Sequence, residues 1–174
     1  SDADGRARHA VVRHGRRGAR HLELVDLRTS VRTELIPGGD ASVADARFGV
    51  TGGQLYVHTD AGAERPALLA VTVRGPVVSA VYPIAERASD DLDMVALDPA
   101  GARAALVWNV DGCSETELLD LRSGHVEPMA APPGEVVTGL AFTRTGDGIL
   151  IGSEGPTVPP RLSHLVLDHP AQPT

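Results

Sequence analysis

An internal repeat constrains the fold of this chain more than any other feature. Four segments share a short apolar pattern around one aligned position; they are residues 24–28, 70–74, 118–122 and 165–169. The aligned positions are 46, 48 and 48 residues apart and are occupied by Asp26, Thr72, Asp120 and Asp168. A period of roughly 20 to 50 residues is typical of solenoids, propellers and related arrays.

A second set of segments repeats with nearly the same period. Residues 46–48, 95–97 and 140–142 recur at spacings of 49 and 45 residues, and a turn rich in Gly, Asp or Pro follows each of them. Glycine and aspartate suit such turns because they tolerate the positive φ angles of tight hairpins. Each turn leads into another apolar strand, so every period holds about four short strands.

The repeat predicts an all-β fold, namely a β-propeller of about four blades with four antiparallel strands each. The blades are expected at about residues 8–40, 41–88, 89–133 and 134–168, with tails at 1–7 and 169–174. No segment shows a sustained helical period. An immunoglobulin-like sandwich also uses short strands, but it would not repeat one motif four times.

The outermost repeats look incomplete. The first begins at the second strand of a blade, residues 8–14, and the last stops after a third strand, residues 162–168. Because exposed strand edges invite pairing with other chains, we expect that the chain closes as a small four-bladed ring, pairs with a second copy, or forms part of a larger ring.

Charge and composition narrow the possible partners. The net charge of −7 argues against a nucleic-acid surface, and no apolar run approaches the length that spans a membrane. Residues 1–20 nevertheless hold six arginines against two aspartates, a patch that is either solvated or faces an acidic partner. The single cysteine, Cys113, excludes an internal disulfide and favours a cytoplasmic location.

Residues 109–120 have the pattern N-x-D-G-x-S-x-x-x-L, and residues 58–68 and 20–27 are similar segments of other blades. All three resemble the propeller blades of the prolyl oligopeptidase and acylaminoacyl peptidase family of serine peptidases. The L-x-D-L element is shared with TolB-like propellers. The resemblance implies a parent in which a propeller of seven or so blades filters peptides for an α/β-hydrolase domain, which this chain does not contain.

No catalytic, cofactor-binding or metal-binding residue is predicted, and no cofactor is expected. The hydrolase family needs a G-x-S-x-G turn, and the nearest segment, residues 151–155, has Ile151 in place of the first glycine, so Ser153 is not expected to be a nucleophile. The seven histidines form no zinc motif, and Asp2 and Asp4 lack the rest of a calcium loop. The acidic run 89–93 is either an ordinary polar loop or a docking point for a cation or a basic partner.

Two functions remain open. The chain is either the peptide-filtering propeller segment of a serine peptidase or a stand-alone, TolB-like protein-binding module without enzymatic activity. The partners expected are therefore peptides together with a hydrolase domain of the same parent, or a second copy of the chain.

Overall fold

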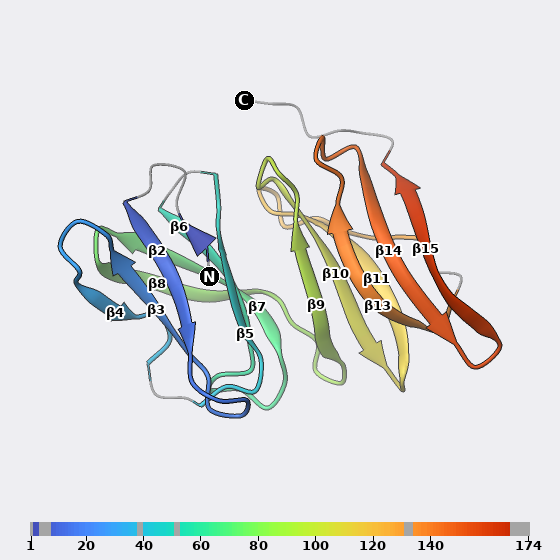
Figure 1. Ribbon diagram of the computed structural model, residues 1–174, viewed down its shortest axis with the longest axis horizontal. Coiled ribbons are helices and arrows are strands. Elements are labelled where there is room, and N and C mark those ends of the chain that lie inside the picture. Colours follow the sequence, from blue (N-terminus) through green and yellow to red (C-terminus); the bar gives the residue numbers. More distant parts are fainter. Residues whose placement is uncertain (1, 4–7, 38–39, 51–52, 131–133, 168–174) are drawn as a thin grey trace. The chain divides into compact units, whose positions relative to one another are not determined.

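The computed structural model describes residues 2–3, 8–37, 40–50, 53–130 and 134–167 (Figure 1). All regular elements in these ranges are β-strands. The chain divides into two compact units, Ser1–Ala88 and Ser89–Thr174. Among the described residues no helix is long and apolar enough to cross a membrane.

The first unit contains two four-stranded sheets. The strands of the first sheet are β1 (Asp2–Ala3), β2 (His9–His14), β3 (His21–Asp26) and β4 (Arg32–Glu34). Those of the second sheet are β5 (Ala44–Phe48), β6 (Gln54–Thr59), β7 (Ala67–Arg74) and β8 (Val77–Ala85). In both sheets the spatial order follows the chain, and every neighbouring pair is antiparallel.

The second unit repeats this plan. One sheet holds β9 (Asp91–Leu97), β10 (Arg103–Val110), β11 (Cys113–Asp120) and β12 (Val126–Pro128). The last holds β13 (Val136–Phe142), β14 (Gly148–Gly155) and β15 (Val158–Val166). These meandering antiparallel sheets are the blades of a β-propeller, which confirms the predicted fold class.

The first blade differs from the prediction. Asp2 and Ala3 lie in the segment expected as a tail, yet they form strand β1, in which Asp2 is paired with Val11 and Ala3 with Ala10. The first blade therefore has its first strand, and the expectation that it begins at residues 8–14 is wrong. A strand of two residues is too short to show alternation, so the sequence carries no signal for it. The expected tail 169–174 lies outside the described residues.

The strand register confirms three of the four aligned positions and corrects the fourth. The first residues of the second strands, His9, Gln54 and Arg103, are paired with Asp26, Thr72 and Asp120. In the last blade the equivalent first residue, Gly148, is paired with Val166, so the position lies two residues before Asp168. A shift of two residues preserves the inward and outward alternation of a strand, which is why the apolar pattern alone misaligned this blade.

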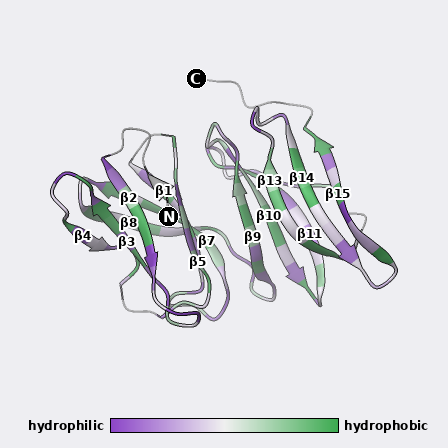
Figure 2. Cartoon of the chain, in the orientation of Figure 1, coloured by the Kyte–Doolittle hydropathy of each residue, from purple (hydrophilic) through white to green (hydrophobic). Residues whose placement is uncertain are grey.

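Alternating side chains build a separate core in each unit. In the first unit, Val11 and Leu24 of the first blade pack with Leu55, Val57 and Val71 of the second, and all five are at most 1% exposed. Along β2 the apolar residues lie in the middle of the strand and the hydrophilic ones at its ends (Figure 2).

In the second unit the core lies between β10–β11 and β13–β14. Ala105, Val107 and Leu118 pack there with Ile149 and Ile151. Each of these interfaces uses one face of each sheet, as expected for stacked blades.

Candidate functional site

Each blade has two ends with different characters. At one end, called here the Asp-turn end, lie the turns that follow the first and third strands of each blade. At the other, called here the connection end, lie the turns that follow the second strand and the links that lead into the next blade. The polar side chains of the described residues are organised differently at the two ends.

The Asp-turn end is held by aspartates that cap turns. Asp26 accepts hydrogen bonds from the backbone N–H groups of Arg28 and Thr29 at 2.8 and 2.9 Å. Asp120 accepts those of Arg122 and Ser123 at 3.0 and 2.7 Å. These bonds lower the pKa of both carboxyl groups because they stabilise the charged form. The repeated aspartate that the sequence revealed therefore has a structural role.

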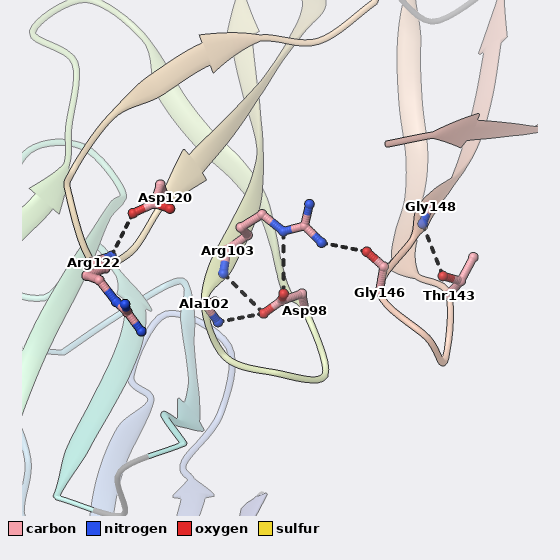
Figure 3. A network of polar contacts seen from close by, with 8 residues as sticks. All are labelled: Asp98, Ala102, Arg103, Asp120, Arg122, Thr143, Gly146 and Gly148. Carbon is pink, nitrogen blue, oxygen red and sulfur yellow. Dashed lines mark hydrogen bonds and ion pairs between the residues drawn. The ribbon is translucent and has the colours of Figure 1, made fainter. Parts of the chain in front are cut away.

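The same end carries a buried polar latch between the third and fourth blades (Figure 3). Asp98 accepts hydrogen bonds from the backbone N–H groups of Ala102 and Arg103 at 2.7 and 3.1 Å, and it lies 3.5 Å from Nε of Arg103. The guanidinium of Arg103 also donates to the carbonyl oxygen of Gly146 at 2.6 Å. Its carbon lies 5.9 Å from the centre of the Phe142 ring. This arginine thereby joins two blades.

Next to this latch, Asp147 closes the turn between β13 and β14. The Thr143 and Thr145 hydroxyls donate to Asp147 at 2.7 and 2.6 Å and lower the pKa of its carboxyl group. The Thr143 hydroxyl also accepts the N–H of Gly148 at 3.2 Å. The polar groups of this turn are therefore engaged within the turn itself.

At the connection end of the first unit, side chains tie loops of neighbouring blades together. Asp60, which follows β6, accepts hydrogen bonds from the hydroxyl and N–H of Ser42 and from the N–H of Val43. Partial burial would raise the pKa of Asp60, but these hydrogen bonds hold it below its ordinary value. Arg13 and Arg20 reach from the first blade to the carbonyl oxygens of Ala44 and Ser42, at 3.1 and 3.2 Å.

At the connection end of the second unit, the motif of residues 109–120 folds into a tight hairpin. Asn109 accepts the N–H of Gly112 at 3.1 Å, while Asp111 and Gly112 have φ angles of 50° and 84°. The hydroxyl of Ser114 accepts the N–H of Val137 at 2.9 Å, which links β11 to the next blade. Asn109 and Ser114 of the motif thus have structural roles, one in the turn and the other at the junction.

A surface depression lies at the connection end of the last blade, around the turn between β14 and β15. Its volume is about 430 Å³, and it is formed by Val136 together with residues 154–160, which include three prolines. Glu154 supplies the carboxylate of this otherwise largely apolar wall.

The residues weighed in the sequence as possible catalysts or ligands do not converge. The hydroxyl of Ser153 is buried on β14 without a hydrogen-bond partner, so no base activates it. His14 and His21 stack with ring centres 5.5 Å apart, and His58 is buried. The described residues include no cluster of His, Cys, Asp or Glu suited to a metal ion. Asp4 and the side chain of Asp2, which were weighed as the start of a calcium loop, lie outside the described residues.

Sequence reasoning missed two groups of residues. The latch of Asp98 and Arg103 was hidden because its acceptor, the carbonyl oxygen of Gly146, lies 43 residues away in the sequence. The tether of Asp60 was hidden for the same reason, since Ser42 lies 18 residues away. Among the side chains that reach a neighbouring blade, only Arg13 and Arg20 belong to a feature that is visible in the sequence, the dense arginines of residues 13–20.

No protein-family model and no curated protein sequence matches this chain. Among solved structures it is similar to TolB from Acinetobacter baumannii, with 15% identity over 96% of this chain and a TM-score of 0.71. A prolyl endopeptidase shares 22% identity over 94% of the chain, with a TM-score of 0.73. A puromycin hydrolase variant shares 18% over 95%, with a TM-score of 0.75. At these identities the likeness shows the propeller fold and not the function.

The chain spans only part of each of these proteins. It covers 40% of the TolB chain, 24% of the prolyl endopeptidase and 26% of the puromycin hydrolase. The activities of the whole proteins therefore reach this chain only as proposals.

Proposed function

We propose that this chain is the non-catalytic propeller segment of a prolyl-oligopeptidase-like serine peptidase. In this role it filters and admits peptide substrates for an α/β-hydrolase domain outside the chain. The observation that carries the proposal is the propeller fold shared with two peptide- or amide-cleaving enzymes, together with the family-like motif at residues 109–120. The hydrolase-type chemistry would belong entirely to the other domain.

The structure suggests how such a filter would work. At the connection end of the first unit, Arg13 and Arg20 of the first blade bond the carbonyl oxygens of Ala44 and Ser42, and Asp60 holds the N–H groups of Ser42 and Val43, so these loops keep a fixed spacing. A rigid set of loops excludes bulky folded proteins by size and discriminates among short peptides by charge. The filter therefore acts through sterics and electrostatics rather than through chemistry of its own.

The coding sequence that flanks these residues in the native gene tests this proposal. We expect an in-frame α/β-hydrolase region with a G-x-S-x-G motif. The full-length product should then cleave short peptides and spare folded proteins that contain the same cleavable bond. A native reading frame without any hydrolase region would contradict the proposal.

The alternative is a stand-alone binding module of the TolB type, without enzymatic activity. The match to TolB, with a TM-score close to those of the peptidases, favours it. This alternative predicts that the native protein binds another protein stably in the absence of any hydrolase domain. The flanking gene sequence separates the two functions directly.

We further propose that the chain is cytoplasmic and associates with more blades, either those of its parent or those of a second copy. The last sheet supports association through the face opposite its core. Leu162 and Val166 project there and are 71% and 64% exposed. Within each unit, by contrast, the two described sheets cover apolar side chains on the faces that they turn toward each other.

A further inference from the structure

The hairpin between β2 and β3 concentrates positive charge in an acidic protein. Residues 13–20 contain four arginines, which are Arg13, Arg16, Arg17 and Arg20, and residues 8–21 contain no acidic residue at all. The whole chain, by contrast, has a net charge of −7. We name these four residues the arginine hairpin. A surface with this local excess of positive charge attracts negatively charged groups.

The hairpin is also a shaped turn. Gly15 and Gly18 adopt φ angles of 92° and 85°, and the N–H of Ala19 donates to the carbonyl oxygen of Arg16 at 2.9 Å. Arg16 and Arg17 lie between the two glycines and are exposed. The turn therefore presents two adjacent guanidinium groups at its tip.

The other two arginines are fixed by the second blade. Arg13 donates one N–H to the carbonyl oxygen of Ala44, and Arg20 donates one to that of Ser42. Two residues of chain span at most about 7 Å, so these anchors hold the two guanidinium groups close together. Each guanidinium has five donors, and these bonds use one of them, which leaves several N–H groups for a ligand.

None of the four arginines has a carboxylate partner among the residues that the structure describes. The nearby carboxylates of the first sheet are engaged elsewhere. Glu23 lies 3.6 Å from His14 and 3.2 Å from Arg32. Glu34 and Asp40 lie 3.5 and 3.4 Å from His21. Within the described part of its own blade, the positive charge of the arginine hairpin is therefore not neutralised.

We propose that the arginine hairpin binds the carboxylates of an acidic peptide segment, with Arg13 and Arg20 as positioned donors and Arg16 and Arg17 as exposed ones. Arginine suits this task because its planar guanidinium matches a carboxylate with two parallel hydrogen bonds. Carboxylates at alternate positions of an extended peptide repeat at about 7 Å, a spacing that two closely anchored guanidiniums can meet. This deepens the proposed filter function, on which it rests, by giving the filter a preference for acidic peptides.

A peptide fits this surface better than a nucleic acid. A polyphosphate chain would extend beyond the hairpin onto a protein whose remaining surface is acidic, and at low salt it would be repelled there. Aromatic residues, which would stack on bases, make up only 3% of the chain. A short acidic segment avoids both obstacles.

Fluorescence anisotropy with the full chain tests the proposal. The probe is a fluorescein-labelled extended peptide with Glu at alternate positions, and the matched probe carries Gln at the same positions. We expect saturable binding of the Glu peptide that weakens as salt rises, and at least tenfold weaker binding of the Gln peptide. The double variant R16Q/R17Q should weaken binding of the Glu peptide on the order of tenfold. The double variant R122Q/R144Q, which removes the same charge at the Asp-turn end, should leave it unchanged.

Three outcomes would overturn the proposal. One is the absence of saturable binding to the Glu peptide at low salt. Another is an equal loss of affinity in R16Q/R17Q and R122Q/R144Q, which would show attraction by net charge alone. The third concerns a labelled single-stranded oligonucleotide with the same net charge as the Glu peptide. If it binds more tightly than the Glu peptide, and if R16Q/R17Q abolishes that binding, the hairpin is a nucleic-acid site. All three results are independent of whether a hydrolase domain is found, so the two proposals fail separately.

Discussion

At the scale of single residues, the chain separates polar groups that hold the fold from polar groups that are left for partners. Arg103, Asp98 and Asp120 bond within or between turns, whereas the exposed arginines between β2 and β3 have no acidic partner among the described residues. Of these, Asp98 and Arg103 are buried, and removing one of them is costly because its partner is left desolvated. This distinction gives two predictions.

Replacing Arg103 with Ala should lower the free energy of unfolding by about 3 kcal/mol. The side chain of Asp98 is only 1% exposed, so its carboxylate would lose a charged neighbour without gaining water, and Gly146 would lose its donor. Urea unfolding of the full chain measures the change. Arg122→Ala is the matched control, since its exposed side chain should cost less than about 0.5 kcal/mol. Equal stability of the two variants would rule out the latch.

The capping carboxylate of Asp120 should make stability depend on pH. Its pKa is lowered in the folded state, so its contribution is present above the unfolded value of 3.8 and is lost as the pH falls through the folded pKa. The free energy of unfolding of the wild type minus that of Asp120→Asn should therefore be larger at pH 6 than at pH 3. Urea titrations at both pH values measure it. The control is Asp93→Asn, at an exposed residue outside the turns, for which this quantity should change less between pH 6 and pH 3. An equal change for both variants would refute the capping role of Asp120.

At the scale of elements, the facing sheets of the second unit contain an imperfect interface. Thr116 on β11 and Ser153 on β14 have buried hydroxyls without hydrogen-bond partners. Thr116 is paired with Val107 and Ser153 with Val137, so both belong to the apolar layer between these sheets. A buried hydroxyl without a partner costs roughly 1–3 kcal/mol of desolvation.

Thr116→Val should therefore stabilise the chain, by about 1 kcal/mol, because it keeps the shape and removes the unsatisfied group. Thermal and urea unfolding measure the change. Thr143→Val serves as the control: its hydroxyl bonds Asp147 and Gly148, so the same substitution there should destabilise. A loss of stability in Thr116→Val would mean that the hydroxyl has a partner, such as a buried water molecule.

At the scale of the whole molecule, association depends on exposed apolar side chains of the last sheet, Leu162 and Val166. Leu162 and Val166 point away from Ile149 and Ile151, since they are paired with Gly152 and Gly148 on the opposite face. His164 lies on the same face between them and its ring lies over Gly148, while the exposed Leu162 and Val166 on either side offer apolar side chains against which another blade can pack.

Leu162→Arg should consequently weaken self-association. Sedimentation velocity over a range of concentrations should show association of the wild type and a shift toward monomer in the variant. Leu27→Arg is the control, because Leu27 is 51% exposed but lies in a turn of the first blade. A wild type that remains monomeric at every concentration would contradict this prediction.

The sequence by itself determined the blade plan of this protein, because turn-forming residues and strand alternation are local properties. The turn aspartates Asp26 and Asp120 follow from that local code, and so does the hairpin at Asn109. Only the tertiary structure decided which residues join the blades, such as Arg103 to Gly146 and Arg13 to Ala44, since those partners are distant in sequence. It also moved the last aligned position to Val166, because a period of two residues cannot fix a register that depends on the neighbouring strand.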